Sequence, residues 1–454
     1  MENRVVNVLD VIDRDPLGRF RVVTIGLCAI VALLDGFDTQ AIAFVASAIA
    51  QDWKVNIATF GAVFAAGLFG LMLGALIMGP VADRFGRKKI IVFATAWFGA
   101  CSLLTAWVTD IQTLVLVRFL TGLGLGAAMP NIIALTSEYA PRHRCTTLVT
   151  LMFCGFPMGA LLGGIVSVKL IAEFGWGSVF IVGGLAPLAM AIILAIWLPE
   201  SIRYVVTRGT EAKTACEICQ AIHREGVYTP QHSFVLDEER LVGSPIKHLF
   251  TRNRAAGTIA LWVVFFSNLL LLYFLVNWLP SVLQRAGMPI DRAIVGVVAL
   301  NAGGIIGGLL LGKIIDKVGP YMVLALTYLA AAPLVAAIGF IESFGGVIAV
   351  ILCAGFCVLG AQFGINALAA NYYPTRMRST GVGWALGMGR IGSIVGPLLG
   401  GLMITAHWTT EMIFGVTAVT ALLAAIAVFV ISRLSVRSCG ESDRADLVAG
   451  EIRA

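Results

Sequence analysis

The sequence GPVADRFGRKK occupies residues 79–89, and a shorter version of it, GKIIDKVG, occupies residues 312–319. Asp83 is the central aspartate of the first stretch, and Asp316 is that of the second. Each stretch follows a run of about 20 mostly apolar residues, which is long enough to cross a lipid bilayer as a helix. The pair therefore indicates a membrane protein whose chain repeats itself.

A second pair of stretches repeats at the same interval. EYAPRHR at 138–144 contains Pro141, and NYYPTRM at 371–377 contains Pro374. The interval between the prolines equals that between the aspartates, because 374 − 141 = 316 − 83. Two unrelated anchors with one offset indicate an internal duplication. Paired six-helix halves of this kind are typical of membrane transporters.

The composition supports a membrane location. The 454 residues are 59% hydrophobic and 13% charged, with a mean hydropathy of +0.91, whereas soluble chains average about 45–50% apolar and about 25% charged residues. The net charge of +6 comes from short basic clusters between apolar runs. Such clusters are typical of cytoplasmic loops, so we expect a lipid bilayer and no nucleic acid as partner.

Twelve runs are apolar and long enough to be transmembrane helices. They form six spans, a polar stretch, and six further spans. This pattern predicts an all-α membrane protein with two pseudo-symmetric six-helix bundles. The predicted spans are 20–49, 58–80, 90–108, 113–136, 147–168, 176–197, 256–280, 293–312, 321–340, 346–369, 380–404 and 412–432.

The basic residues in the short loops predict the orientation. Loops after spans 2, 4, 8 and 10 carry ten Lys and Arg residues, and loops after the odd-numbered spans carry four. Because cytoplasmic loops hold the excess of Lys and Arg, we expect both termini on the cytoplasmic side of a bacterial inner membrane. No cleavable signal peptide is expected, since the first apolar run is too long. The expected parts are a cytoplasmic segment 1–19, a first bundle 20–197, a polar connecting loop 198–255, a second bundle 256–433 and a tail 434–454.

Four ionisable residues fall well inside the predicted spans: Asp35 and Asp38 in span 1, Arg118 in span 4 and Arg390 in span 11. Each charge at such depth costs about 2.5–3.5 kcal/mol on insertion scales and commonly marks an ion or proton pathway. Asp35 and Asp38 are three residues apart and so share one helix face.

The predicted depths bring Asp38 close to Arg118. Asp38 lies about 16 Å and Arg118 about 8 Å below the periplasmic surface at 1.5 Å per residue, which the arginine side chain can bridge. The pair has two interpretations, a static ion pair that joins helices and a proton site. Arginine keeps its proton in proteins, so Asp35 and Asp38 are the candidates for proton coupling.

Arg390 lies near the predicted midplane with no acidic residue at that depth in the second half. Its planar guanidinium suits a carboxylate, so a bound organic anion is one expected counter-ion. Pairing with an aspartate of span 1 is the alternative. Polar and aromatic residues of spans 7, 10 and 11 suit either an aromatic substrate or helix packing; they are Asn268, Tyr273, Asn277, Trp278, Gln362, Asn366 and Trp384.

The sequence predicts no metal or other cofactor. Cys216 and Cys219, followed by His223, lack the second ligand pair that a zinc site needs, and the nine scattered cysteines do not suggest a disulfide framework. No Walker-type phosphate-binding loop occurs, so the proton is the expected coupling ion.

The stretch at 79–89 resembles the loop signature of the major facilitator superfamily, and RFLTGLGLG (118–126) resembles its span 4 signature. DGFDTQ (35–40), LPESIRY (198–204), NWLP (277–280) and YPTRMRSTGVGWALGMGRIGSIVGP (373–397) resemble the aromatic acid/proton symporter family within it. This resemblance implies twelve helices, alternating access and proton-driven uptake of benzoate-, hydroxybenzoate- or hydroxyphenylpropionate-type acids. A monomer is expected.

The resemblance also implies roles for single residues. The span 1 aspartates of the family fall on Asp35 and Asp38, its span 4 arginine on Arg118 and its span 11 arginine on Arg390. The second loop copy departs from the pattern, since it ends in DKVGP and lacks a basic run. Cytoplasmic gating is expected of Asp83, Arg84, Arg87, Glu138, Asp316 and Arg378.

Other functions are weaker alternatives. A transporter of another organic anion, or a proton-coupled exporter of a drug or metabolite, shares the same intramembrane charges. A membrane enzyme would need a nucleophile or metal constellation at one depth, and a receptor would need a signalling domain. Neither is present in the sequence, so no enzymatic activity is expected.

Overall fold

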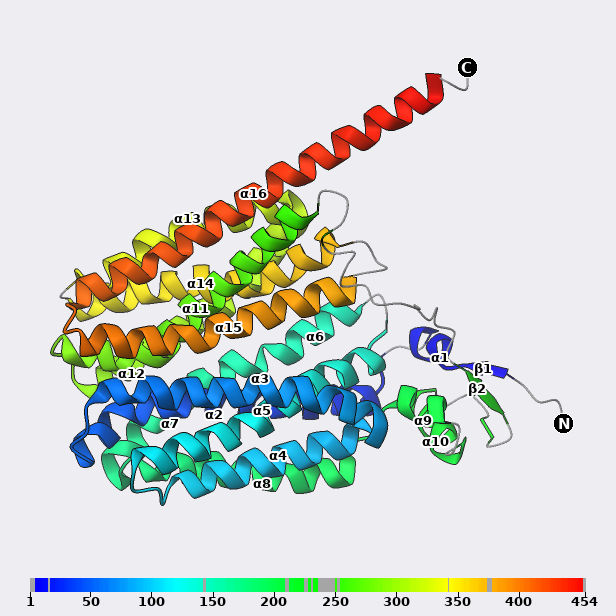
Figure 1. The fold of residues 1–454 in the computed structure, drawn as a ribbon. Coiled ribbons are helices and arrows are strands. Elements are labelled where there is room, and N and C mark those ends of the chain that lie inside the picture. Colours follow the sequence, from blue (N-terminus) through cyan, green and yellow to red (C-terminus); the bar gives the residue numbers. More distant parts are fainter. Residues whose placement is uncertain are drawn as a thin grey trace. The chain divides into compact units, whose positions relative to one another are not determined.

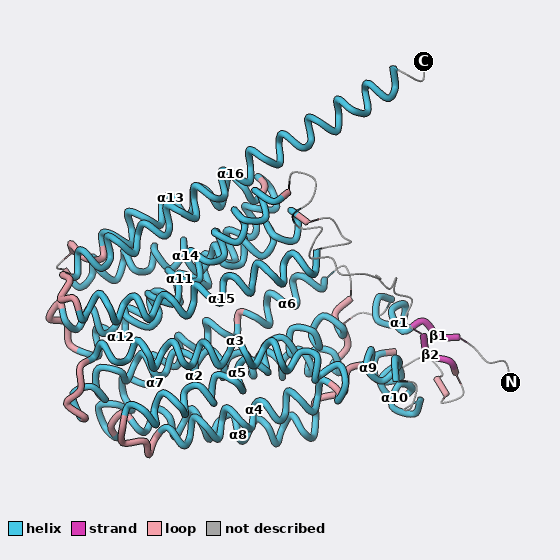
Figure 2. The backbone as a smooth tube through the Cα atoms, viewed as in Figure 1, coloured by secondary structure: helices cyan, strands magenta, loops and turns pink. Residues whose placement is uncertain are grey.

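The computed structural model describes residues 5–14, 17–141, 144–208, 212–223, 228–229, 232–235, 250, 254–341, 343–373 and 378–451. The chain forms two compact units, Met1–Arg240 and Leu241–Ala454 (Figure 1). Both are built almost entirely of helices, which Figure 2 shows as cyan tubes. Twelve helices within the described part are long and apolar enough to cross a membrane, as the sequence predicts.

The first unit holds the first six spans. The fifth span consists of two short helices in sequence, because the helix is interrupted at Cys154. The spans of this unit are α2 (Arg19–Asp52), α3 (Phe60–Phe85, preceded by the short η1, Ile57–Thr59), α4 (Arg87–Thr105), α5 (Ile111–Tyr139), α6 (Cys145–Phe153) with α7 (Gly155–Phe174), and α8 (Gly177–Trp197).

The second unit holds the other six spans, and its last helix continues past the apolar span to Glu451. The helices are α11 (Ala255–Arg285), α12 (Ile290–Val318), α13 (Pro320–Ala337), α14 (Phe344–Tyr372), α15 (Arg378–Thr405) and α16 (Thr410–Glu451).

Helix packing repeats between the units. In the first, the most extensive contacts join α3 with α5, α4 with α8 and α2 with α7. In the second, they join α12 with α14, α13 with α16 and α11 with α15. In both units, the first span packs against the fifth, the second against the fourth and the third against the sixth. Each unit is therefore one copy of a single six-helix arrangement.

The turns repeat residue by residue at the interval that separates Asp83 from Asp316. Gly86 and Gly319 end corresponding helices with φ of 96° and 93°. At the other end of the repeat, Lys54 takes a left-handed φ of 53° where the second copy has Gly287 at 93°. Glycine tolerates this region without steric cost, and Lys54 keeps the same turn despite its side chain.

Close helix contacts repeat as well. A Cβ on Gly159 of α7 would overlap the carbonyl oxygen of Leu33 in α2, and one on Gly392 of α15 would overlap that of Phe266 in α11. Both members of this contact are shifted by the same interval as the turns. The small residues let the backbones of the first and fifth spans approach closely, as is common between membrane helices.

The segments of the first unit outside the membrane spans contain structure that the sequence does not predict. The first strand, β1 (Val5–Asn7), pairs in parallel with β2 (Ser233–Val235), shown in magenta in Figure 2. Short helices accompany them: α1 (Val8–Arg14), α9 (Ile202–Arg208) and α10 (Ala212–Ile222). Most of these elements are too short to show a hydrophobic period. The sequence therefore predicts residues 198–255 only as a polar connecting loop.

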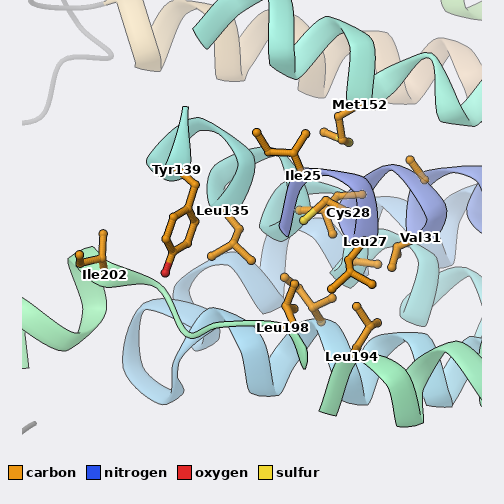
Figure 3. Close-up of a cluster of buried hydrophobic side chains, with 14 of the residues drawn as sticks. Ile25, Leu27, Cys28, Val31, Leu135, Tyr139, Met152, Leu194, Leu198 and Ile202 are labelled. Carbon is orange, nitrogen blue, oxygen red and sulfur yellow. The ribbon is translucent and has the colours of Figure 1, made fainter. Parts of the chain in front are cut away.

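These segments pack onto the ends of the membrane helices. Ile202 of α9 belongs to one buried cluster with Tyr139, Leu198 and Cys28 (Figure 3). The buried Arg21 of α2 donates a hydrogen bond of 2.8 Å to the carbonyl oxygen of Ile12 in α1, which fastens the amino-terminal segment to the first span.

The close contact of α2 with α7 gives a test. Gly159→Ala places a methyl group against the Leu33 carbonyl and forces the helices apart, so we expect a loss of about 1–3 kcal/mol in stability, as for other overpacked cores. Thermal unfolding of the purified protein in detergent measures the change. Gly26→Ala, in α2 with nothing within 4 Å of the added Cβ, is the matched control and is expected to unfold at or above the parent temperature. Equal unfolding of the two variants would contradict the contact.

Candidate functional site

An ion pair joins the first and fourth spans inside the first unit. Arg118 of α5 donates from Nη2 to Oδ2 of Asp38 and to the main-chain oxygen of the same residue, both at 3.1 Å. Asp38 is 0% and Arg118 3% exposed. The contact expected from the helix depths is therefore present, while its part in proton coupling stays a prediction.

The pair is not fully satisfied. Oδ1 of Asp38 and Nη1 of Arg118 are buried and have no hydrogen-bond partner in the described structure. A bidentate arginine–carboxylate pair would form two parallel N–H···O hydrogen bonds, one to each carboxylate oxygen. Buried polar atoms without hydrogen-bond partners cost free energy. The guanidinium also lies 5.8 Å from the ring centroid of Phe180 in α8, so a cation–π contact supports it on one side.

Asp35 lies one turn before Asp38 and is also 0% exposed. Its Oδ1 accepts a hydrogen bond of 3.1 Å from Thr39 Oγ1, one turn later in α2. Two carboxylates thus accompany one guanidinium, so the cluster carries a net charge of −1 when both are ionised. Binding one proton makes it neutral. In a low-dielectric interior this difference is large, and the arrangement can hold a proton.

Arg390 of α15 occupies the second unit. Its Nη1 lies 3.5 Å from the hydroxyl oxygen of Tyr273 in α11, at the limit of a hydrogen bond. No acidic side chain pairs with it among the described residues of that unit. Arg390 is partly exposed, and because a guanidinium at this depth is costly in lipid, its exposed part is expected to face water or a bound anion.

Two residues proposed as substrate contacts have structural roles. Asn277 is buried and donates to the carbonyl oxygen of Tyr273 one turn earlier at 2.7 Å. Trp384, 43% exposed, stacks on Trp262 with ring centroids 5.9 Å apart. It shares a helix stripe with the exposed apolar side chains of Ile391, Leu398 and Leu402, which favours lipid contact and packing for this ring.

Gln362 and Asn366 lie one turn apart on α14, and both are partly exposed. Gln362 Oε1 accepts a hydrogen bond of 2.5 Å from Asn268 Nδ2, and Asn268 Oδ1 accepts one of 2.9 Å from the hydroxyl of Tyr328 in α13. Oδ1 of Asn366 is buried and has no partner among the described residues. Tyr328 was not identified from the sequence, because a single tyrosine in an apolar span has no distinguishing pattern.

Three residues of the predicted cytoplasmic gate make contacts within the first unit, and their gating role stays a prediction. Arg87, at the start of α4, forms an ion pair with Glu138 near the end of α5. Ser201 donates to the second oxygen of Glu138 at 2.6 Å. The carbonyl oxygen of Arg84 accepts a hydrogen bond from Tyr204 at 3.4 Å. The side chains of Asp83, Asp316 and Arg378 lie outside the described residues.

Glu200 also belongs to this cluster, although the sequence alone does not single it out as a functional residue. Its Oε1 accepts hydrogen bonds from the backbone N–H of Lys88 at 3.0 Å and of Ser201 at 2.8 Å. A carboxylate at a helix N-terminus satisfies free N–H groups and the helix dipole. The hydroxyl of Tyr139 donates to the Glu200 carbonyl at 2.6 Å. Glu200 falls in the LPESIRY stretch, which is the sequence signal for it.

The CxxC pair lies on α10 outside the membrane spans. Burial raises the pKa of the Cys219 thiol to about 12, and burial and the nearby Glu217 raise the pKa of Cys216. Both thiols are therefore poor nucleophiles at neutral pH. Among the described residues, no group of three or more His, Cys, Asp or Glu side chains is arranged to hold a metal ion.

Comparison with solved structures supports the fold. The xylose transporter XylE from E. coli matches with a TM-score of 0.70 at 17% identity, covering 91% of this chain and 98% of that one. A bacterial homologue of the human lysosomal transporter Spinster matches with a TM-score of 0.71 at 16% identity, covering 92% and 98%. At such identities the likeness concerns the fold alone.

The sequence model of the Major Facilitator Superfamily matches residues 28–386 and 335–444. The chain belongs to the major facilitator superfamily, and it is a multi-pass membrane transporter and not an enzyme.

Within the superfamily, the chain falls among the aromatic acid transporters. It is 39% identical to the 4-hydroxybenzoate transporter PcaK of Pseudomonas putida over 94% of this chain and 97% of that protein. The gallate transporter of P. putida is 38% identical, over 93% and 94%. The 3-(3-hydroxy-phenyl)propionate transporter of Escherichia coli K12 is 37% identical, over 92% and 96%.

The ion pair gives a second test. Arg118→Leu leaves the Asp38 carboxylate buried without its cation, and breaking a buried pair in this way typically costs about 3–5 kcal/mol. The double variant Asp38→Asn/Arg118→Leu removes both charges of the pair and is expected to recover part of that stability, because Asp35 stays buried without the cation. Thermal unfolding in detergent measures both, with Arg292→Leu, at an exposed arginine of α12, as control. A double variant no more stable than Arg118→Leu would contradict this account.

Proposed function

We propose that this transporter imports small aromatic carboxylates together with protons across a bacterial inner membrane, with both termini in the cytoplasm. The observation that carries the proposal is the buried cluster of Asp35, Asp38 and Arg118. Two carboxylates within one turn of α2 accompany a single arginine, at a depth where charge is tolerated mainly for function.

Proton loading follows from this charge balance. Two nearby carboxylates in a low dielectric raise the proton affinity of one of them, and the guanidinium lowers it. When Arg118 moves away from Asp38, the balance shifts toward proton binding, and when it returns the proton is released. Arg118 donates to the Asp38 carboxylate through Nη2. Breaking this single contact costs less free energy than breaking a bidentate pair would.

Arg390 is the proposed carboxylate contact of the substrate. It has no acidic partner among the described residues of its own unit, and the hydroxyl of Tyr273 lies 3.5 Å from it, which adds a second polar group for one carboxylate. The named substrates of the three relatives are all aromatic carboxylic acids. A benzene ring with a carboxylate is therefore the proposed class.

Energetics limit the coupling. A monoanion imported with one proton moves no net charge, so only the pH gradient and the substrate gradient drive it. A second proton would recruit the membrane potential, worth about 2.3 kcal/mol per elementary charge per 100 mV. The cytoplasmic cluster of Arg87, Glu138 and Glu200 is proposed to hold the inner side of the first unit closed during part of an alternating-access cycle.

Transport by proteoliposomes tests the coupling. Purified protein is expected to accumulate labelled 4-hydroxybenzoate when the lumen is alkaline, and to stop at equilibrium when a protonophore is added. Asp35→Asn and Asp38→Asn, which cannot release a proton, are expected to lose at least tenfold in accumulation. Active uptake that survives Asn at both positions would overturn proton coupling through this cluster, and pumping out of the vesicles only would favour export.

The role of Arg390 has its own test. Lysine keeps the charge of Arg390 but loses the planar pair of donors, so Arg390→Lys is expected to raise the KM for 4-hydroxybenzoate at least tenfold. Initial uptake rates over a range of concentrations measure it. Arg285→Lys, at an exposed arginine at the end of α11, is the matched control and should leave KM unchanged. A KM unaffected by Arg390→Lys would show that the substrate binds elsewhere.

A further inference from the structure

A chain of three hydrogen-bonding side chains crosses the second unit from α13 through α11 to α14. The Tyr328 hydroxyl donates to Asn268 Oδ1 at 2.9 Å, and Asn268 Nδ2 donates to Gln362 Oε1 at 2.5 Å. Tyr328 and Asn268 are both 0% exposed, whereas Gln362 is partly exposed. The chain therefore begins in the buried core of the unit and ends at a surface.

The direction of these bonds fixes which group of Gln362 faces outward. The structure places Oδ1 of Asn268 toward the Tyr328 hydroxyl and Nδ2 of Asn268 toward Gln362. The Gln362 oxygen accepts the hydrogen bond from Asn268. Its Nε2, which carries two N–H donors, therefore points away from Asn268. The hydrogen bond described for the Gln362 side chain is made by its oxygen, and this side chain is partly exposed.

The exposed end of this chain is expected to face water and not lipid. An amide with unused donors is costly in hydrocarbon, and polar groups at this depth face the bundle interior or a water-filled cavity. Asn366, one turn further along α14, adds a buried oxygen without a partner among the described residues. Donor and acceptor groups are thus available on the same face of one helix.

Arg390 and Gln362 each contact a side chain of α11. Tyr273, the neighbour of Arg390, and Asn268, the neighbour of Gln362, are both on α11 and five residues apart. Along the helix axis they are about 7.5 Å apart at 1.5 Å per residue, and at 3.6 residues per turn their side chains leave α11 about 140° apart. Asn268 points toward α13 and α14, and Tyr273 points toward α15. A hydroxybenzoate has a carboxylate at one end and a hydroxyl at the other, separated by one benzene ring.

We propose that Gln362 and Asn366 bind the ring hydroxyl of the substrate, and that Asn268 and Tyr328 are positioning residues that hold the Gln362 amide in one orientation. This inference rests on the proposed function and deepens it. A phenolic hydroxyl both accepts and donates a hydrogen bond, which matches the Gln362 N–H groups and the Asn366 oxygen. An unsubstituted benzoate leaves both unsatisfied, and sites built to bond a hydroxyl reject the analogue lacking it.

Competition between two substrates tests the proposal on the complete protein in proteoliposomes. The measured quantity is the ratio of kcat/KM for 4-hydroxybenzoate to that for benzoate. Gln362→Met removes the contact at similar volume, and Tyr328→Phe removes only the hydroxyl that orients Asn268. We expect the ratio to fall at least tenfold in Gln362→Met and at least threefold in Tyr328→Phe, with benzoate transport retained.

Thr327→Val is the matched control, because the Thr327 hydroxyl is buried next to Tyr328 and its partner among the described residues is the carbonyl of Val323 in its own helix. Its substrate ratio should equal that of the parent. A purely structural role for the three side chains would lower transport of both substrates together and leave the ratio unchanged, and that result in Tyr328→Phe and Gln362→Met would overturn the inference.

The two proposals fail in different ways. If the parent protein transports no aromatic acid, the proposed function fails. If the parent transports both acids but the ratio is the same in every variant, only the hydroxyl contact fails. Tyr328→Phe deletes a single oxygen atom, so it decides the question even if a larger change such as Asn268→Leu prevents folding.

Discussion

Hydrocarbon does not solvate charge, and this constraint determines where the ionisable groups of this transporter lie. Removing an ion from water costs several kcal/mol even after the protein relaxes, so Asp35, Asp38 and Arg118 are tolerable only as a group. The group is satisfied incompletely: Thr39 bonds one carboxylate, and Arg118 offers one fork to the other. A fully bonded triad would be a static fastening between helices. The incomplete one leaves Oδ1 of Asp38 and Nη1 of Arg118 without partners among the described residues, and the proposed exchange of a proton uses this unmet bonding capacity.

The internal duplication shows which positions have been specialised. Backbone contacts and turns of the spans repeat at one constant interval along the chain, so positions in the spans of one unit have counterparts in the other. The charged residues break this rule. The counterparts of Asp38 and Arg118 are Leu271 and Ile351, and the counterpart of Arg390 is Pro157. Because the surrounding packing is retained, these charges are not needed to form the six-helix arrangement.

The sequence alone predicts the twelve spans and the Asp38–Arg118 contact, and both predictions have the same physical basis. Long apolar runs and rare charges within them are strong signals in a lipid solvent, and matched depths bring Asp38 and Arg118 together. The ends were less certain: span 1 was expected at 20–49 and the helix covers Arg19–Asp52, because polar residues can extend a helix beyond the bilayer. Glu200 and Tyr328 could not be assigned, since their roles depend on neighbours 112 and 60 residues away. The β1–β2 pairing joins segments with no local signal.

The counterpart of Asp35 in the second unit is Asn268, and this substitution separates two tasks. A carboxylate at that position would change charge as protons are loaded, and any substrate contact that depended on it would change too. An amide does not titrate, and free phenols in water ionise only near pH 10. The three hydrogen-bonded side chains from Tyr328 to Gln362 therefore stay uncharged across the physiological pH range. In the proposed mechanism, the first unit responds to protons while the second recognises its ligand in the same way whether or not a proton is bound.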